Sequence, residues 1–309
     1  MSGKIDIRQL TYVALMSGIN ISFILLNWWI PLFSLVLAVA VPFSACLVRL
    51  KCNFRYSFLY FFCSLAIPIL LDFQTALFLL LPSVISGFLF GFLVLKKVHG
   101  FYLVTAVSLF QIGIQMLSVY LIRALYHVDM IEVYSGILGL EAQKFYDIFL
   151  LFFFLFGLIQ MLFCYFIIES EIEKFGYRID ETPRIFLSVT LETIFFSVGG
   201  WLFRIFFPSA GSLMTGISLL TAVYLLFQIH EMNRRFTRIL TIVSFVLGCI
   251  TAVAISPYFR QNGFHFLFNL FSLTTGLNGG IVILYLYLFR KEKITPELFV
   301  DKTDEPTEY

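Results

Sequence analysis

Residues 148–168, IFLLFFFLFGLIQMLFCYFII, form an apolar run that contains no charged side chain. A transmembrane α-helix needs about 20 predominantly apolar residues to cross the hydrocarbon core of a bilayer, and this run has that length. Similar runs recur almost from one end of the 309-residue chain to the other. The sequence therefore predicts an all-α fold, a polytopic bundle of transmembrane helices.

The composition places the chain outside the soluble classes. Hydrophobic residues make up 60% of the sequence and charged residues 13%, with a mean hydropathy of +0.93. Soluble globular domains contain roughly 45–50% apolar and about 25% charged residues. The formal net charge is only +2 and the basic residues are scattered, which excludes nucleic acid as a partner. The expected surroundings of the chain are therefore membrane lipids.

Ten apolar segments are long enough to be transmembrane helices. Lysine and arginine collect in alternate connections, as expected when positive residues stay on the cytoplasmic side. A cytoplasmic N-terminus places all but four of the 21 basic residues inside, and the even number of spans then puts both termini in the cytoplasm. The predicted spans are residues 10–27, 30–48, 56–72, 75–95, 101–124, 147–168, 185–203, 209–229, 239–256 and 265–289.

A charged connection at residues 169–184, ESEIEKFGYRIDETPR, divides the predicted spans into two blocks. Residues 8–168 form a six-span block and residues 185–289 a four-span block. The tail at 290–309 is charged and contains proline, which predicts disorder. Within the first block, the semi-apolar loop at 125–146 is too polar to span the membrane. We expect it to lie at the external interface or to cover a cavity.

No catalytic signature occurs in the sequence: HExxH, GxSxG, Walker A and paired metal-ligand spacings are all missing. The prediction is therefore a protein that is not an enzyme, with no catalytic residue, no metal and no cofactor. An intramembrane enzyme whose acids come from distant loops remains the third interpretation. The five cysteines are odd in number and include no CxxC pair, which predicts reduced, structural thiols.

Polar side chains in the outer half of the first block are the candidate ligand-binding residues. Gln111 and Gln115 lie four residues apart and therefore share one face of a helix. Asn27, Asp72 and Gln74 lie in external turns on the same side. Such amides also form hydrogen bonds between helices, and this alternative stays open. Their clustering beneath the loop predicts a small-molecule pocket that opens outward.

Glu192 is the acidic residue placed most deeply in a predicted span. Ionisable residues inside spans are functional candidates in membrane proteins. A central acid costs roughly 3 kcal/mol, whereas the Ile, Leu, Val and Phe residues of this span favour insertion by about 4 kcal/mol. The span can thus insert without a partner for Glu192, so a structural role stays open beside a functional one.

Pairs of small residues at helical spacing predict close approach of another backbone. Gly87 with Gly91 and Gly276 with Gly280 form two such pairs, which usually pack helices within one chain. Ala14 and Gly18 form a third pair near the predicted cytoplasmic start of the first span. We expect this pair to be a contact surface that a second protein can reach.

The segments LTYVALMSGIN (10–20), WWIPLFSLVLAVAVPFSACLVRLK (28–51) and LLPSVISGFLFGFLVLKK (80–97) resemble the YybS-type family of bacterial polytopic membrane proteins. The N-terminal half of that family is similar to the substrate-binding S components of energy-coupling factor transporters. The resemblance implies a location in the bacterial cytoplasmic membrane. It also implies that Ala14 and Gly18 match the docking motif on the first helix of S components, with Gly in place of the usual second Ala.

The leading hypothesis is a membrane protein that binds a small molecule from the outer side and takes part in its uptake. Its expected partners, by resemblance, are a coupling protein and ATPase subunits. The four additional spans and the missing nucleotide-binding segment depart from the S-component pattern. The alternative is a non-transporting assembly or regulatory protein that binds envelope proteins.

Overall fold

The computed structural model describes residues 6–30, 33–71, 73–177, 179, 185–231 and 263–285, together with residues 239, 242, 243, 246, 250 and 287. Within these residues every regular element is a helix, which confirms the predicted all-α class. Seven helices are long and apolar enough to cross a membrane, as expected of a multi-pass membrane protein. They are α1 (Ile7–Trp29), α3 (Phe54–Leu71), α6 (Gly100–Tyr126), α8 (Ala142–Ile172), α9 (Phe186–Phe206), α10 (Pro208–Glu231) and α12 (Gly263–Tyr285).

Two further predicted spans are also helical. The span predicted at 30–48 corresponds to α2, and the span predicted at 75–95 corresponds to η1 followed by α5. The span predicted at 239–256 falls mostly outside the described residues, and the tail at 290–309 falls wholly outside them. The remaining elements are α2 (Phe33–Lys51), α4 (Phe73–Thr75), the π-helical turn η1 (Ala76–Leu80), α5 (Leu81–Leu95), α7 (Met130–Leu138) and the 3-10 turn η2 (Glu173–Phe175).

The chain divides into two compact units. One comprises Met1–Phe145 with Phe152–Glu181, and the other comprises Tyr146–Leu151 with Thr182–Tyr309. Helix α8 continues beyond residue 168, where the predicted span ends, because its last turn is built from residues that are compatible with a helix in water. A 2.6 Å ion pair between Glu171 and Lys174 lies at this end of the helix.

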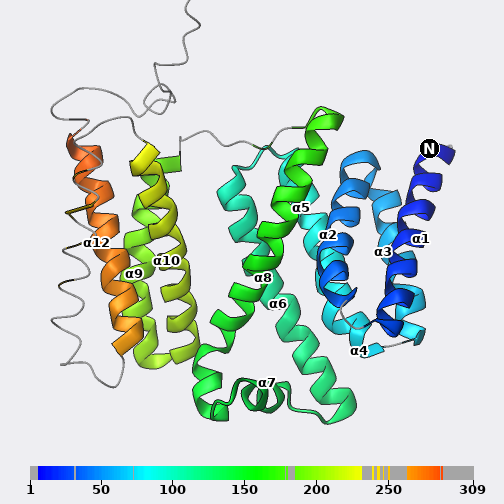
Figure 1. Ribbon diagram of the computed structural model, residues 1–309, viewed down its shortest axis with the longest axis horizontal. Coiled ribbons are helices and arrows are strands. Elements are labelled where there is room, and N and C mark those ends of the chain that lie inside the picture. The colour runs from blue at the N-terminus through cyan, green and yellow to red at the C-terminus, as the bar shows by residue number, and fades with distance from the viewer. Residues whose placement is uncertain are drawn as a thin grey trace, which may run out of the picture. The chain divides into compact units, whose positions relative to one another are not determined.

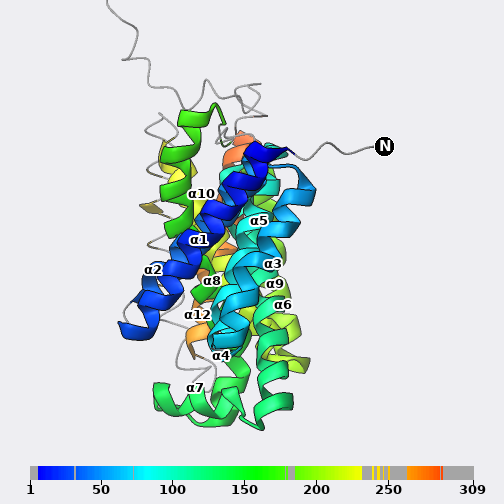
Figure 2. The ribbon, with the colours of Figure 1, turned by 90° about the vertical axis from the view of Figure 1, so that its right-hand side faces the viewer.

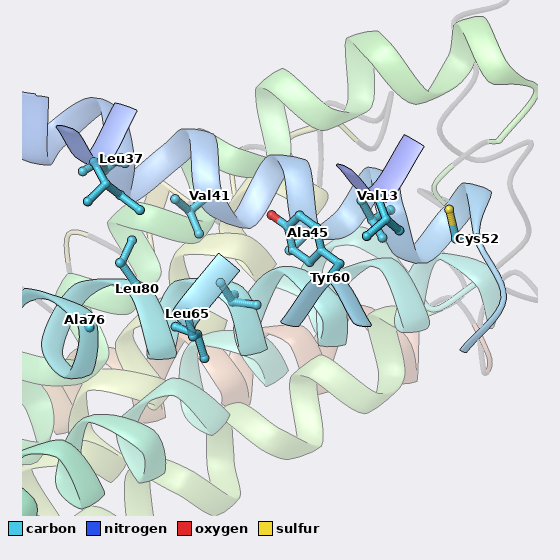
Figure 3. Close-up of a cluster of buried hydrophobic side chains, with 12 residues drawn as sticks. Val13, Leu37, Val41, Ala45, Cys52, Tyr60, Leu65, Ala76 and Leu80 are labelled. Atoms are coloured by element: carbon cyan, nitrogen blue, oxygen red, sulfur yellow. The ribbon is translucent and has the colours of Figure 1, made fainter. Parts of the chain in front are cut away.

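Helix α2 packs against three other helices of the first unit, α1, α3 and α5. Figures 1 and 2 show α1 at the edge of this unit, beside α2 and α3. The buried core between these helices includes Val13, Val41 and Tyr60, and Figure 3 shows the Tyr60 ring pointing towards α2 at Ala45. Core side chains from α1, α2 and α3 thus position the polar groups described below.

Glycines on α5 allow this helix to lie directly against α2. A Cβ atom on Gly87 would overlap the backbone carbonyl of Pro42 and would lie 2.7 Å from the Cβ atom of Ala45. A Cβ atom on Gly91 would lie 2.9 Å from the Cβ atom of Arg49. Real Cβ atoms do not approach other atoms this closely, so both positions require glycine. The predicted Gly87–Gly91 pair therefore packs two helices of the same chain.

The helices of the first unit alternate in direction, as Figure 1 shows, and this alternation separates the basic residues. Arg123 and Lys144 lie at the end of the helices where α7 lies. The other described lysines and arginines of the unit collect at the opposite end, as the positive-inside pattern requires. They are Arg8, Arg49, Lys51, Arg55, Lys96, Lys97 and Lys174.

The predicted external loop contains a short helix, α7. The side chain of Asp129 caps its N-terminus by accepting a hydrogen bond from the backbone N–H of Ile131 (2.9 Å). The Tyr134 ring contacts an aromatic cluster that includes Phe145 and Phe153, and burial raises the pKa of the Tyr134 hydroxyl. Ile137 on the same helix is exposed. The loop therefore contains a helix that is anchored by its aromatic contacts and exposes an apolar side chain.

Candidate functional site

The exposed face of α1 carries a stripe of four small residues, Thr11, Ala14, Gly18 and Ser22, which we call the α1 stripe. All four are exposed, and a Cβ atom on Gly18 would meet no atom within 4 Å. The Thr11 hydroxyl donates to the backbone carbonyl of Ile7 (2.8 Å), and the Ser22 hydroxyl donates to that of Gly18 (2.9 Å). Because both hydroxyls are satisfied within the helix, the stripe presents no unpaired polar group to lipid.

The opposite face of α1 is held by a buried polar cluster that joins three helices. The Asn20 amide on α1 donates to the hydroxyl of Tyr60 on α3, and the hydroxyl of Ser44 on α2 donates to Oδ1 of Asn20 (3.0 Å). The Ser44 and Tyr60 hydroxyls are 2.6 Å apart. All three side chains are buried, and the Ser44 hydroxyl also lies within hydrogen-bond distance of the Val41 carbonyl on its own helix (2.9 Å). The cluster fixes the rotation of α1 and thereby turns the stripe outward.

A second buried network is centred on Gln160 of α8. Its Nε2 donates to the backbone carbonyl of Ala38 on α2 (2.5 Å) and to the hydroxyl of Ser83 on α5 (3.0 Å). Its Oε1 accepts from Nε2 of Gln111 on α6 (2.5 Å). One amide thus connects α8 to three helices of the first unit. Gln160 was not among the predicted site residues, although it is the only amide side chain in the span predicted at 147–168.

The predicted ligand-binding residues are only partly brought together. Gln111 and Gln115 are both buried on α6. Gln111 forms a hydrogen bond to another helix, which is the alternative to ligand binding given for these amides. Asn27 lies on α1, which packs mainly on α2 and α3. Its Oδ1 is buried and has no hydrogen-bond partner among the described residues. Asp72 lies outside the described residues, as does the side chain of Gln74.

The face of α6 that carries Gln111 and Gln115 contacts the π-helical turn η1. A π-helical turn removes backbone carbonyls from the regular hydrogen-bond pattern, and such turns are frequent at functional sites. The Ser118 hydroxyl donates to the carbonyl of Leu77 in η1 (2.9 Å) and also to the carbonyl of Ile114 on its own helix (3.1 Å). Ser118 thus holds the irregular turn against α6, one turn along from Gln115.

The helices of the second unit meet along a seam of small and polar residues, which we call the hydroxyl seam. On α9 and α12 the buried seam residues follow one spacing, i, i+3, i+7 and i+10. Hydroxyls of the seam donate mainly to carbonyls of their own helices, for example Thr193 to Val189 (2.7 Å). The seam residues are Thr190, Thr193, Ser197 and Gly200 on α9, Thr215 and Ser218 on α10, and Asn269, Ser272, Gly276 and Gly279 on α12.

Asn269 is the exception in this seam. Its side chain is fully buried, and neither Nδ2 nor Oδ1 has a hydrogen-bond partner among the described residues. A Cβ atom on Gly200 would lie 3.0 Å from Oδ1 of Asn269 and 3.0 Å from Oγ1 of Thr215, so the amide lies against α9 at Gly200, the glycine that Thr215 of α10 also approaches. The Ser197 hydroxyl donates to the backbone carbonyl of Asn269 (2.5 Å) and not to its side chain. A buried, unpaired amide is costly and is the clearest polar anomaly of this unit.

Glu192 lies on α9 beside the hydroxyl seam. It is half-buried, next to the fully buried Thr193. The predicted Gly276–Gly280 pair needs correction. A Cβ atom on Gly276 would lie 2.7 Å from Cγ1 of Ile194, but one on Gly280 would meet open space. The second close approach occurs at Gly279, because one turn of a helix is 3.6 residues and this packing follows the i+3 position.

Among the residues that the structure describes, no group of three His, Cys, Asp or Glu side chains could hold a metal ion. The described cysteines, Cys46, Cys52, Cys63 and Cys164, are free thiols. Desolvation by burial raises the pKa of the Cys52 thiol, with a further increase from the charge of Asp6. A raised pKa keeps the Cys52 thiol protonated and unreactive, in keeping with a structural role for this residue.

Comparisons of the whole chain with protein-family models, with curated proteins and with solved structures found no match.

Proposed function

We propose that this chain is a membrane-embedded binding protein that takes part in the uptake of a small molecule, and that a partner protein docks on the α1 stripe. The proposal draws on the resemblance to S components, in which the first helix docks onto a coupling protein. The observation that supports it best is the division of α1 into two faces. One face is bound into the unit through Asn20, and the other exposes Ala14 and Gly18.

The α1 stripe has the properties that helix association in a bilayer requires. Lipid tails are as apolar as leucine, so burying leucine against another helix contributes little, and close packing decides whether two helices associate. Ala14 and Gly18 form a shallow region beside the exposed side chains of Leu15 and Ile19. A partner helix could approach the backbone there without displacing any described side chain.

The proposal predicts that the double substitution Ala14→Leu and Gly18→Leu abolishes partner binding. Two leucine side chains would fill the region that the partner helix approaches, and a Cβ atom added at position 18 would meet no described atom within 4 Å. The full chain would be purified in mild detergent and the copurifying proteins identified by mass spectrometry. Complementation of a deletion strain would measure the function in parallel. We expect loss of the partner and of complementation at an unchanged protein level.

A matched control is available on α6. Ala106 and Gly113 are also exposed, and a Cβ atom on Gly113 would meet no atom within 4 Å. The double substitution Ala106→Leu and Gly113→Leu should leave partner binding unchanged. If the α1 variant keeps its partner and its phenotype, the docking proposal is wrong. Recovery of envelope proteins instead of coupling and ATPase subunits would contradict uptake and support an assembly role.

A further inference from the structure

The first unit contains an apolar groove between α2, α3, α5 and α6, which we call the phenylalanine groove. Its volume is about 310 Å³, at the lower end of the roughly 300–1,000 Å³ typical of ligand sites. Six of its lining side chains are phenylalanines, and Arg49 lies among the remaining residues. The phenylalanines are Phe54, Phe58, Phe61, Phe88, Phe92 and Phe110. This lining suits a hydrocarbon chain, because it offers almost no polar partner.

Two positive charges lie beside Phe92 of the phenylalanine groove: Arg49 is one of the lining residues, and Lys96 lies just outside them. The guanidinium of Arg49 lies 5.9 Å from the centre of the Phe92 ring, and the ammonium of Lys96 lies 5.7 Å from the same centre. A further contact places the Arg49 guanidinium 6.0 Å from the Phe54 ring. Neither cation forms an ion pair with a carboxylate in the described part of the chain. The groove therefore carries two uncompensated charges beside Phe92.

The fold holds Arg49 in this place. Gly91 on α5 makes room for it, since a Cβ atom at position 91 would lie 2.9 Å from Cβ and 3.2 Å from Cγ of Arg49. Arg49 and Lys96 belong to the end of the unit where its basic residues collect. In a bilayer, that end of a transmembrane helix lies at the depth of the lipid headgroups, where Lys and Arg side chains are stable.

We propose that the phenylalanine groove binds an anionic phospholipid. One acyl chain lies along the phenylalanine side chains, and the phosphate contacts Arg49 and Lys96. Basic sites between helices at the membrane surface attract anionic headgroups, and each Lys or Arg near the surface contributes to that attraction. A zwitterionic lipid would gain less from two uncompensated cations, and a free phosphate ester would leave the apolar groove unused. This site is separate from the α1 stripe and does not depend on its role.

Native mass spectrometry of the full chain in mild detergent tests the proposal. The protein would be incubated with equal amounts of dioleoylphosphatidylglycerol and dioleoylphosphatidylcholine. We expect the anionic lipid to be retained preferentially. Replacing both cations, Arg49→Gln with Lys96→Gln, should lower the bound ratio of anionic to zwitterionic lipid by about tenfold or more. Filling the groove with Ile85→Trp should reduce the retention of both lipids.

The control replaces two exposed basic residues at the same end, Arg55→Gln with Lys97→Gln, neither of which lines the groove. It changes the net charge equally and should keep the lipid ratio of the unmodified protein. Thermal unfolding in detergent verifies that each variant is folded. Equal retention of the two lipids by the unmodified protein overturns the proposal, as does a control that loses selectivity equally. Displacement of the anionic lipid by glycerol 3-phosphate would assign the cations to a soluble phosphate ester instead.

Discussion

The substitution Gln160→Leu is expected to destabilise the protein by about 2–4 kcal/mol, because three partners on three helices would lose their hydrogen bonds. These partners are the carbonyl of Ala38, the hydroxyl of Ser83 and the amide of Gln111. The leucine side chain is similar in size, so loss of packing contributes little. Reversible unfolding in SDS, or the unfolding temperature in mild detergent, would measure the change.

Asn269→Leu is the matched control for this prediction. It also replaces a buried amide by leucine, but the amide of Asn269 has no partner among the described residues. Removing an unpaired polar group eliminates a cost, so we expect unchanged or increased stability. The double variant Gln111→Leu with Gln160→Leu should cost less than the sum of the two single changes. Equal losses for Gln160→Leu and Asn269→Leu would show that hydrogen bonding by Gln160 is unimportant.

Gly87→Ala is expected to be similarly damaging, with a loss of about 3 kcal/mol. The added methyl group would overlap the carbonyl of Pro42 and lie 2.7 Å from Cβ of Ala45. Both contacts involve atoms that are fixed to the backbone, so α5 would have to move away from α2. The same unfolding measurement would detect the loss, together with a lower yield of folded protein.

The substitution Gly113→Ala should instead stabilise the protein. Gly113 lies inside α6, is exposed, and has no atom within 4 Å of the position that a Cβ would occupy. Alanine there gains up to about 1 kcal/mol from its higher helix propensity, with no steric cost. If Gly87→Ala were as stable as Gly113→Ala, the close packing of α5 on α2 in the structure would be incorrect.

The helices themselves were predictable, because long apolar runs and the placement of basic residues are local properties of the sequence. Gly87 and Gly91 could likewise be selected from their spacing alone. The helix that a glycine pair contacts could not be predicted, because it depends on how the helices pack. Gly280 illustrates the limit: its spacing from Gly276 is typical of a packing pair, yet Gly279 makes the contact.

The candidate site was less predictable than the fold. Gln111 could be selected because it is an amide in a span, but its partner Gln160 is 49 residues away. Tyr60 could not be selected from the sequence, because a tyrosine in an aromatic-rich span is usual. Its role in the polar cluster is evident only from the positions of Asn20 and Ser44 beside its hydroxyl. Polar contacts between distant helices follow from the tertiary arrangement, which periodicity does not encode.

The hydroxyl seam has a consequence for how α9 and α12 can move along each other. Its spacing repeats every seven residues, yet a shift by two helical turns would bring Asn269 to the place of Gly276, where a Cβ atom would lie 2.7 Å from Cγ1 of Ile194. The Thr193 hydroxyl donates within α9, whereas the Ser197 hydroxyl donates to the backbone carbonyl of Asn269 on α12. Close packing at Gly276 and Gly279, more than hydrogen bonding, therefore fixes the axial register of the two helices.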